Sequence, residues 1–158
     1  MKKIITSGVS FGLTSATITT LGLMMGLYSS TNSKMVVIGA ILIIAVADSF
    51  SDALGVHISE ESKNNKTEKE VWYMTLCTLL SKFVFALSYA IPFVFCDIKI
   101  AIVVDMIWGF ILLSSLSYFI AKESKEKPIK IISEHLLIAT MVIITTHYIG
   151  LWIGGVFK

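Results

Sequence analysis

Hydrophobic residues dominate five long stretches of the chain, and short polar segments separate these stretches. Each stretch is near the ~20 residues that a spanning helix needs, and they run over about 4–28, 35–58, 71–95, 99–121 and 131–153. None alternates with the two-residue period of a membrane barrel strand, and in lipid only helices and closed barrels satisfy every backbone group. The pattern predicts an all-α membrane protein, a bundle of five transmembrane helices. Pro92, near the end of the third stretch, should kink or end that helix.

Composition supports lipid as the solvent of this bundle. Of the 158 residues, 55% are hydrophobic and 15% are charged, whereas soluble domains carry about 25% charged residues. The polar connections are too short to bury a core of their own, so we expect residues 1–158 to form a single integral membrane domain. All 13 basic residues are lysines, and without clustered arginine we expect no nucleic-acid partner.

The lysines also predict an orientation. Nine of them lie before the first stretch, between the second and third, or between the fourth and fifth, and only three lie on the other side. Cytoplasmic loops carry an excess of lysine and arginine. We therefore expect a cytoplasmic N-terminus and an outside C-terminus. A short chain without an organelle transit signal favours a prokaryotic cytoplasmic membrane.

Two acidic residues interrupt the second stretch. Asp48 and Asp52 are four residues apart, so both carboxylates share one face of a helix. A charge at the bilayer centre costs at least ~2.5–3.5 kcal/mol and is therefore a candidate for function. Two carboxylates this close repel each other, and one should keep its proton unless a cation arrives. The pair suits exchange of a divalent cation for protons.

Further candidates lie where the second stretch ends. His57, Glu60 and Glu61 follow at the predicted inner mouth, where imidazole nitrogen and carboxylate oxygen suit ions such as Mn²⁺ and Fe²⁺. We interpret them as metal-gathering residues. The segment "SEESKNNKTEKE" also alternates in charge, as any solvated loop does, so a plain loop is the competing interpretation.

Three further ionisable residues lie inside the predicted spans. Lys82 is at the same depth as Asp48, counted by the helix rise. It is either half of a structural ion pair or a mobile counter-ion that releases Asp48 when a cation binds. Asp105 and His147 have similar depth nearer the outer surface, and form either an exit site or a plain hydrogen bond between helices.

Small residues mark a predicted packing surface of the first stretch. Glycines four residues apart let helix backbones approach closely in lipid, and the first stretch has two such pairs, Gly8 with Gly12 and Gly22 with Gly26. Serine and threonine residues crowd the same stretch, where they either line a polar face or bond to the backbone of their own helix. We interpret the glycines as the packing surface of a homodimer.

Four segments, taken together, resemble the vacuolar iron transporter family over nearly the whole chain. They are "SFGLTSATITTLGLMMGL", "ADSFSDALGVHIS", "TLLSKFVFALSYAIPFVF" with its late proline, and "ISEHLLIATMVIITTHYIGLWIG". The resemblance implies five spanning helices, a dimer formed through the first helix, and export of Fe²⁺ or Mn²⁺ from the cytosol in exchange for protons. It implies no permanently bound cofactor. Asp48 matches an aspartate of the family, and Glu134 matches a glutamate that would close the cytoplasmic entrance.

The chain departs from the family pattern along the ion path. Phe11 replaces an acid before the Gly-Leu pair, Asp52 takes the position of a methionine ligand, and Val56 replaces an acid after the glycine. His57 stands at the position of an aromatic residue. The glutamate-rich cytoplasmic insert is reduced to residues 59–70.

The expected function is therefore divalent metal transport by proton exchange. The alternative is a membrane scaffold or interaction protein that transports nothing and keeps Asp48 and Lys82 as a structural pair. We expect no enzyme, because the sequence has no nucleophile–base constellation, phosphate loop or zinc-type histidine spacing.

Overall fold

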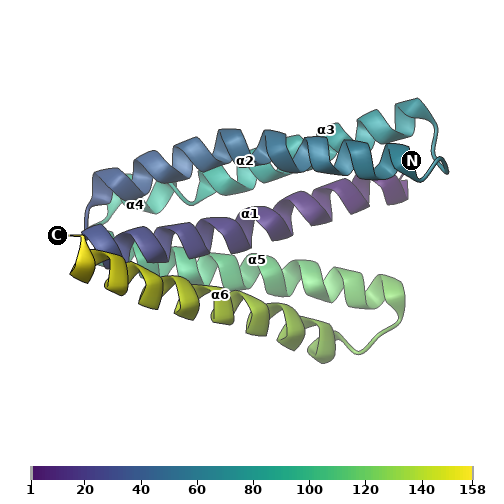
Figure 1. Cartoon of the computed structure of the whole chain (residues 1–158). Coiled ribbons are helices and arrows are strands. Elements are labelled where there is room, and N and C mark those ends of the chain that lie inside the picture. The colour runs from purple at the N-terminus through teal and green to yellow at the C-terminus, as the bar shows by residue number, and fades with distance from the viewer. Residues whose placement is uncertain (1, 158) are drawn as a thin grey trace.

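A computed structural model of the chain describes residues 2–157, and all of its regular structure is helical. Figure 1 shows the helices running roughly along one axis. Their bounds are α1 (Lys2–Thr31), α2 (Lys34–Ser62), α3 (Glu68–Ser88), α4 (Ile91–Phe95), α5 (Ile98–Ser124) and α6 (Pro128–Val156).

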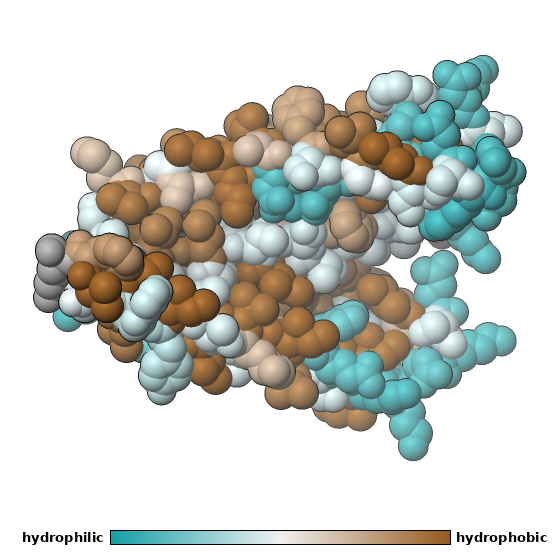
Figure 2. All heavy atoms as spheres, viewed as in Figure 1, coloured by the Kyte–Doolittle hydropathy of each residue, from teal (hydrophilic) through white to brown (hydrophobic). Residues whose placement is uncertain are grey.

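Five of these segments match the predicted spans. Five helices are long and apolar enough to cross a membrane, when α3 and α4 are taken together as Glu68–Phe95. Their large apolar side chains face outward along most of the bundle, as the brown surface of Figure 2 shows. The predicted all-α architecture with five long apolar helices is confirmed.

Local signals set the ends of the helices. Ser33 caps α2 by accepting a hydrogen bond from the backbone of Val36, and Thr67 with Glu70 forms a capping box at the start of α3. Such caps satisfy amide groups that have no partner inside the helix. At the other end of a helix, Lys125 adopts a left-handed conformation that terminates α5.

The third predicted span is broken near its end. Helix α3 stops at Ser88, and the short α4 begins at Ile91 with Pro92 in its first turn. Proline has no amide hydrogen for the carbonyl four residues earlier, and its ring clashes with that carbonyl. The prediction that Pro92 kinks or ends this helix is confirmed.

Helix α1 occupies the centre of the bundle. It lies between α2 and α3 on one side and α5 and α6 on the other (Figure 1). Ala16, Leu21 and Met24 of α1 are fully or almost fully buried. Helix α1 therefore connects the half of the bundle that contains α2 and α3 with the half that contains α5 and α6.

The glycines of α1 pack against helices of the same chain. A Cβ atom added at Gly12 would lie 2.7 Å from the carbonyl oxygen of Thr78 in α3, and one at Gly8 would meet the Met74 carbonyl at the same distance. Gly22 and Gly26 contact α6 instead. The interpretation of these four glycines as a dimer surface is therefore wrong, because α3 and α6 of the same chain already cover them.

The two ends of the bundle differ in how many charged residues they carry. The N-terminal end of α1, the α2–α3 loop and the α5–α6 loop lie together (Figure 1), and hydrophilic residues gather there (Figure 2). We call this the lysine-rich end. The α1–α2 loop, α4 and the C-terminal end of α6 form the opposite end.

Candidate functional site

The ammonium group of Lys82 is the centre of an ion cluster in the middle of the bundle. Its side chain is 1% exposed and forms ion pairs with Asp48 and Asp52, the latter at 2.5 Å between Nζ and Oδ2. It also donates a hydrogen bond to the Ser15 hydroxyl at 2.9 Å, and Ser15 in turn donates to Asp52 Oδ2 at 2.6 Å. An ammonium has three donors, and here each donor has a partner. We call these four residues the Lys82 cluster.

Three helices contribute to the Lys82 cluster. Asp48 and Asp52 lie one turn apart on α2, Lys82 lies on α3, and Ser15 lies on α1. Helix α1 comes close enough because Gly12 has no side chain: its added Cβ would lie 3.0 Å from the Lys82 backbone nitrogen. The close approach of α1 to α3 thus seals the lysine and brings the Ser15 hydroxyl to it.

The charges of the Lys82 cluster do not cancel. Two carboxylates and one ammonium leave a formal charge of −1 when all three are ionised. The lysine is sealed, but the side chains of Asp48 and Asp52 remain 27% and 22% exposed. Figure 2 shows a hydrophilic patch over the middle of α2, within an otherwise apolar surface. The cluster can therefore take up one more positive charge, as a proton or as part of a cation.

A cavity connects Asp52 with the lysine-rich end. Its volume is about 510 Å³, and it lies between α1, α2 and α3. Asp52 lines its deep part and Glu60 its outer part, with the hydroxyl groups of Ser7, Ser51 and Ser59 on its wall. A second, largely apolar groove of about 460 Å³ reaches Asp48 from the opposite direction, between α1 and α2. Ser51 lines both spaces.

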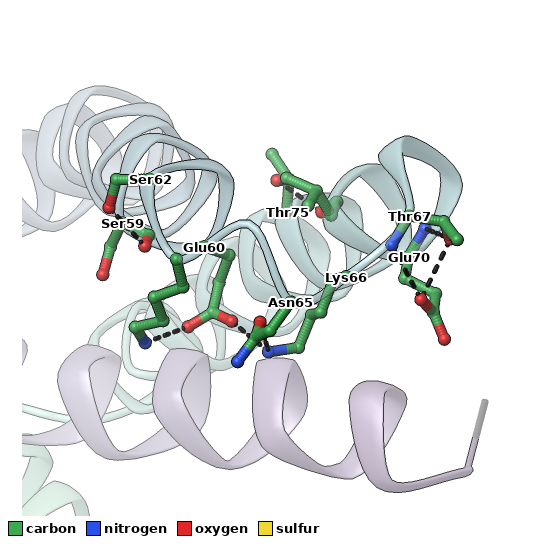
Figure 3. A network of polar contacts seen from close by, with 10 residues as sticks. Ser59, Glu60, Ser62, Asn65, Lys66, Thr67, Glu70 and Thr75 are labelled. Carbon is green, nitrogen blue, oxygen red and sulfur yellow. Dashed lines mark hydrogen bonds and ion pairs between the residues drawn. The ribbon is translucent and has the colours of Figure 1, made fainter.

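Glu60 is held at the mouth of the first cavity by two lysines. Its carboxylate pairs with Lys63 at 2.6 Å and with Lys66 through the other oxygen, and it points from α2 toward α1 (Figure 3). The residue is buried although it stands beside a charged loop. The predicted place of Glu60 at the inner mouth is thus consistent with its position, but its oxygens already have cationic partners.

His57 and Glu61 do not join the acidic pair. His57 Nδ1 lies 3.0 Å from the Thr75 hydroxyl of α3, and its ring stacks at 4.6 Å against Trp72. Glu61 is exposed, and neither residue lines the cavity. Within residues 2–157 no group of three or more His, Cys, Asp or Glu side chains is placed to hold a metal ion. Of the five residues predicted to bind metal, the structure brings Asp48 and Asp52 together around Lys82 and places Glu60 at the mouth of the cavity, whereas His57 and Glu61 lie apart from them.

The structure also does not bring together Asp105 and His147, the two residues of the predicted outer site. His147 Nδ1 pairs with the Ser29 hydroxyl at 2.7 Å, whereas both carboxylate oxygens of Asp105 are buried without a hydrogen-bond partner among the described residues. Glu134 is exposed on α6 and does not line the cavity. The hydrogen bond expected between Asp105 and His147 is therefore not formed.

The sequence placed Lys82 at the depth of Asp48 and left two interpretations open, and the structure joins these residues in one ion pair. Ser15 is the member that sequence reasoning did not single out. Its only signal was the density of hydroxyl residues in the first span. Comparisons of the chain with known protein families, with curated proteins and with solved structures found no match.

Proposed function

We propose that this protein exports a divalent cation, Fe²⁺ or Mn²⁺, from the cytoplasm in exchange for protons, and that the Lys82 cluster is the exchange site. One observation carries the proposal: two aspartates inside an apolar helix share a sealed lysine at the end of a cavity. An uncompensated carboxylate in the hydrocarbon zone is costly. It persists most readily where a mobile positive charge periodically neutralises it.

Protonation supplies that charge when no metal ion is bound. Lys82 compensates one carboxylate, and a proton on Asp48 or Asp52 compensates the other. A divalent cation that arrives through the cavity displaces the proton and separates the ammonium from the two carboxylates. The carboxylate oxygens and the Ser15 hydroxyl are then the ligands of the cation. Electrostatic repulsion by Lys82 then favours release of the ion on the far side.

The orientation of transport follows from the lysines. The cavity extends from Asp52 to Glu60, which lies near the lysine-rich end, and the positive-inside rule assigns that end to the cytoplasm. Glu60, tethered by Lys63 and Lys66, would exchange these partners for the incoming cation. The proposed path therefore runs from Glu60 to Asp52 and Asp48.

One feature favours a second function, a membrane scaffold without transport. All three donors of Lys82 already have acceptors, as expected of a permanent structural ion pair. In that case the carboxylates would contribute only to packing or to a partner surface. The two functions differ in whether metal ions cross the membrane.

Metal flux in proteoliposomes distinguishes them. With Mn²⁺ outside and a proton gradient, we expect uptake by the parent protein and a loss of at least tenfold in Asp48→Asn and Asp52→Asn. The exposed Asp97 lies at the N-terminal end of α5 without a capping bond, so Asp97→Asn is the matched control and should leave flux unchanged.

Two outcomes count against the proposal. Flux that persists in both aspartate variants would remove the Lys82 cluster as the exchange site. Absence of Mn²⁺ and Fe²⁺ flux in the parent, in protein that is folded and correctly inserted, would favour the scaffold.

A further inference from the structure

Two further buried polar residues lie between the Lys82 cluster and the end of the bundle opposite the lysine-rich end. Asp105 of α5 and Tyr89, which links α3 to α4, are both fully buried. Neither the carboxylate oxygens of Asp105 nor the hydroxyl of Tyr89 makes a hydrogen bond of normal geometry within the described residues. Buried polar atoms without partners are rare, and each one calls for a physical explanation.

Tyr89 and Asp105 belong to one site. The Tyr89 hydroxyl lies 3.0 Å from the point that a Cβ of Gly109 would occupy, and Gly109 follows Asp105 by one helical turn on the same face. Because Gly109 has no side chain, the Tyr89 hydroxyl can lie against the part of α5 that carries Asp105.

No cation compensates Asp105. Among the described residues its carboxyl group takes part in no ion pair, since the one buried lysine is held by Asp48 and Asp52. Leaving an ionised carboxylate alone in a low-dielectric interior costs several kcal/mol, and the group becomes neutral instead. A neutral carboxyl group also has a hydrogen to donate. The Tyr89 hydroxyl, which reaches the next turn of α5 at Gly109, is itself without a hydrogen-bond partner among the described residues.

We propose that Asp105 with Tyr89 is a second proton-binding site, in which the carboxyl group holds an exchangeable proton. Its part in transport rests on the function proposed above: it would carry protons between the Lys82 cluster and the opposite end of the bundle. Tyr89 follows Lys82 by seven residues, about 10 Å along the helix direction. The hydroxyl of Thr20, also buried without a hydrogen-bond partner among the described residues, lies on α1 five residues beyond Ser15, toward the opposite end of the bundle.

The layer between the two sites is apolar. Ala16, Ala45 and Ala86 pack together there, one from each of α1, α2 and α3, and Phe83, Phe85 and Leu87 pack against them. A proton that moves between the two sites has to cross this layer.

Infrared spectroscopy of the full-length protein in liposomes tests the site without relying on metal flux. A protonated carboxyl group has a carbonyl stretch apart from that of carboxylates. We expect such a band at neutral pH in the parent, its loss in Asp105→Asn, its retention in Asp97→Asn, and a shift when H₂O is replaced by D₂O. In Tyr89→Phe the band should persist at a changed frequency, because the polar hydroxyl group near the carboxyl group is gone.

Each outcome decides one step. A parent-minus-Asp105→Asn difference spectrum without the band means that Asp105 is ionised and overturns the site. A band that does not move in D₂O means a sealed structural acid and overturns the proton exchange. If the parent transports no metal but both infrared results hold, the proton site stands while the transport function fails. Tyr89→Phe keeps the test valid if Asp105→Asn does not fold.

Discussion

At the scale of single residues, the position of Lys82 is unusual because its charge is sealed while its partners are not. The lysine is 1% exposed, whereas Asp48 and Asp52 each border a cavity or groove. A lysine inside a membrane helix normally reaches toward water with its long side chain. Here the carboxylates and Ser15 bring acceptors to it, so the acids, not the lysine, are the groups that an entering ion meets.

Removing the ammonium should destabilise the protein through the carboxylates left behind. We expect Lys82→Met to lower the free energy of unfolding by up to ~3 kcal/mol, the lower end of the range for broken buried pairs, since both acids keep some exposure. Denaturant unfolding in detergent measures the loss. Lys99→Met is the control, because Lys99 is exposed at the start of α5.

A compensating variant separates charge from packing. Asp48→Asn and Asp52→Asn combined with Lys82→Met should recover most of the lost stability, since no charge is then left unpaired. A triple variant as unstable as Lys82→Met alone would mean that the lysine contributes through packing and not through its charge.

At the scale of helices, close backbone contact organises the bundle around α1. Gly12 brings α1 against α3, and Gly150 brings α6 against α1, where its added Cβ would lie 2.2 Å from the carbonyl oxygen of Gly26. Helix association in lipid depends on such van der Waals contact, because lipid tails are as apolar as leucine. The same contacts position Ser15 and seal Lys82.

Glycine-to-alanine substitutions should therefore have opposite signs at different positions. Gly12→Ala and Gly150→Ala should each lower the free energy of unfolding by ~1–3 kcal/mol through overpacking against backbone atoms. Gly39→Ala should instead raise it by up to ~1 kcal/mol, because an added Cβ there meets nothing within 4 Å and alanine favours the helix. Thermal unfolding of the three variants measures both effects, and equal effects at all three positions would contradict this account of the contacts.

At the scale of the whole molecule, charged residues are distributed unevenly between the two ends, and the cavity extends from Asp52 toward one of them. Hydrophilic residues gather at the lysine-rich end, and the rest of the surface is mainly apolar (Figure 2). If the helices cross a membrane, this asymmetry orients the cavity toward the side that holds most lysines. The direction of the proposed transport depends on that orientation.

Cysteine labelling tests the orientation. In a background with Cys77→Ala and Cys96→Ala, which removes both free thiols, we place one cysteine at each end. An impermeant maleimide applied to intact cells should label Asp97→Cys and leave Asn65→Cys unlabelled until the membrane is opened. Both positions are exposed, so the reverse pattern would invert the orientation and with it the direction of export.

The sequence by itself determined the features that depend only on position along a helix. Apolar length predicted five spans, Pro92 predicted the break before α4, and the four-residue spacing put Asp48 and Asp52 on one face. Counting the helix rise placed Lys82 at their depth. Each of these inferences uses local geometry, which is the same in every helix.

Only the tertiary structure decided which side chains meet, because the rotation of a helix about its axis is set by its neighbours. It brought Ser15 to Lys82, turned His57 toward Thr75, paired His147 with Ser29, and placed the Tyr89 hydroxyl against Gly109, one turn from Asp105. The glycines of α1, predicted to join two chains, join helices of one chain instead. Depth along the bundle follows from counting residues, whereas lateral contact depends on how all the helices pack together.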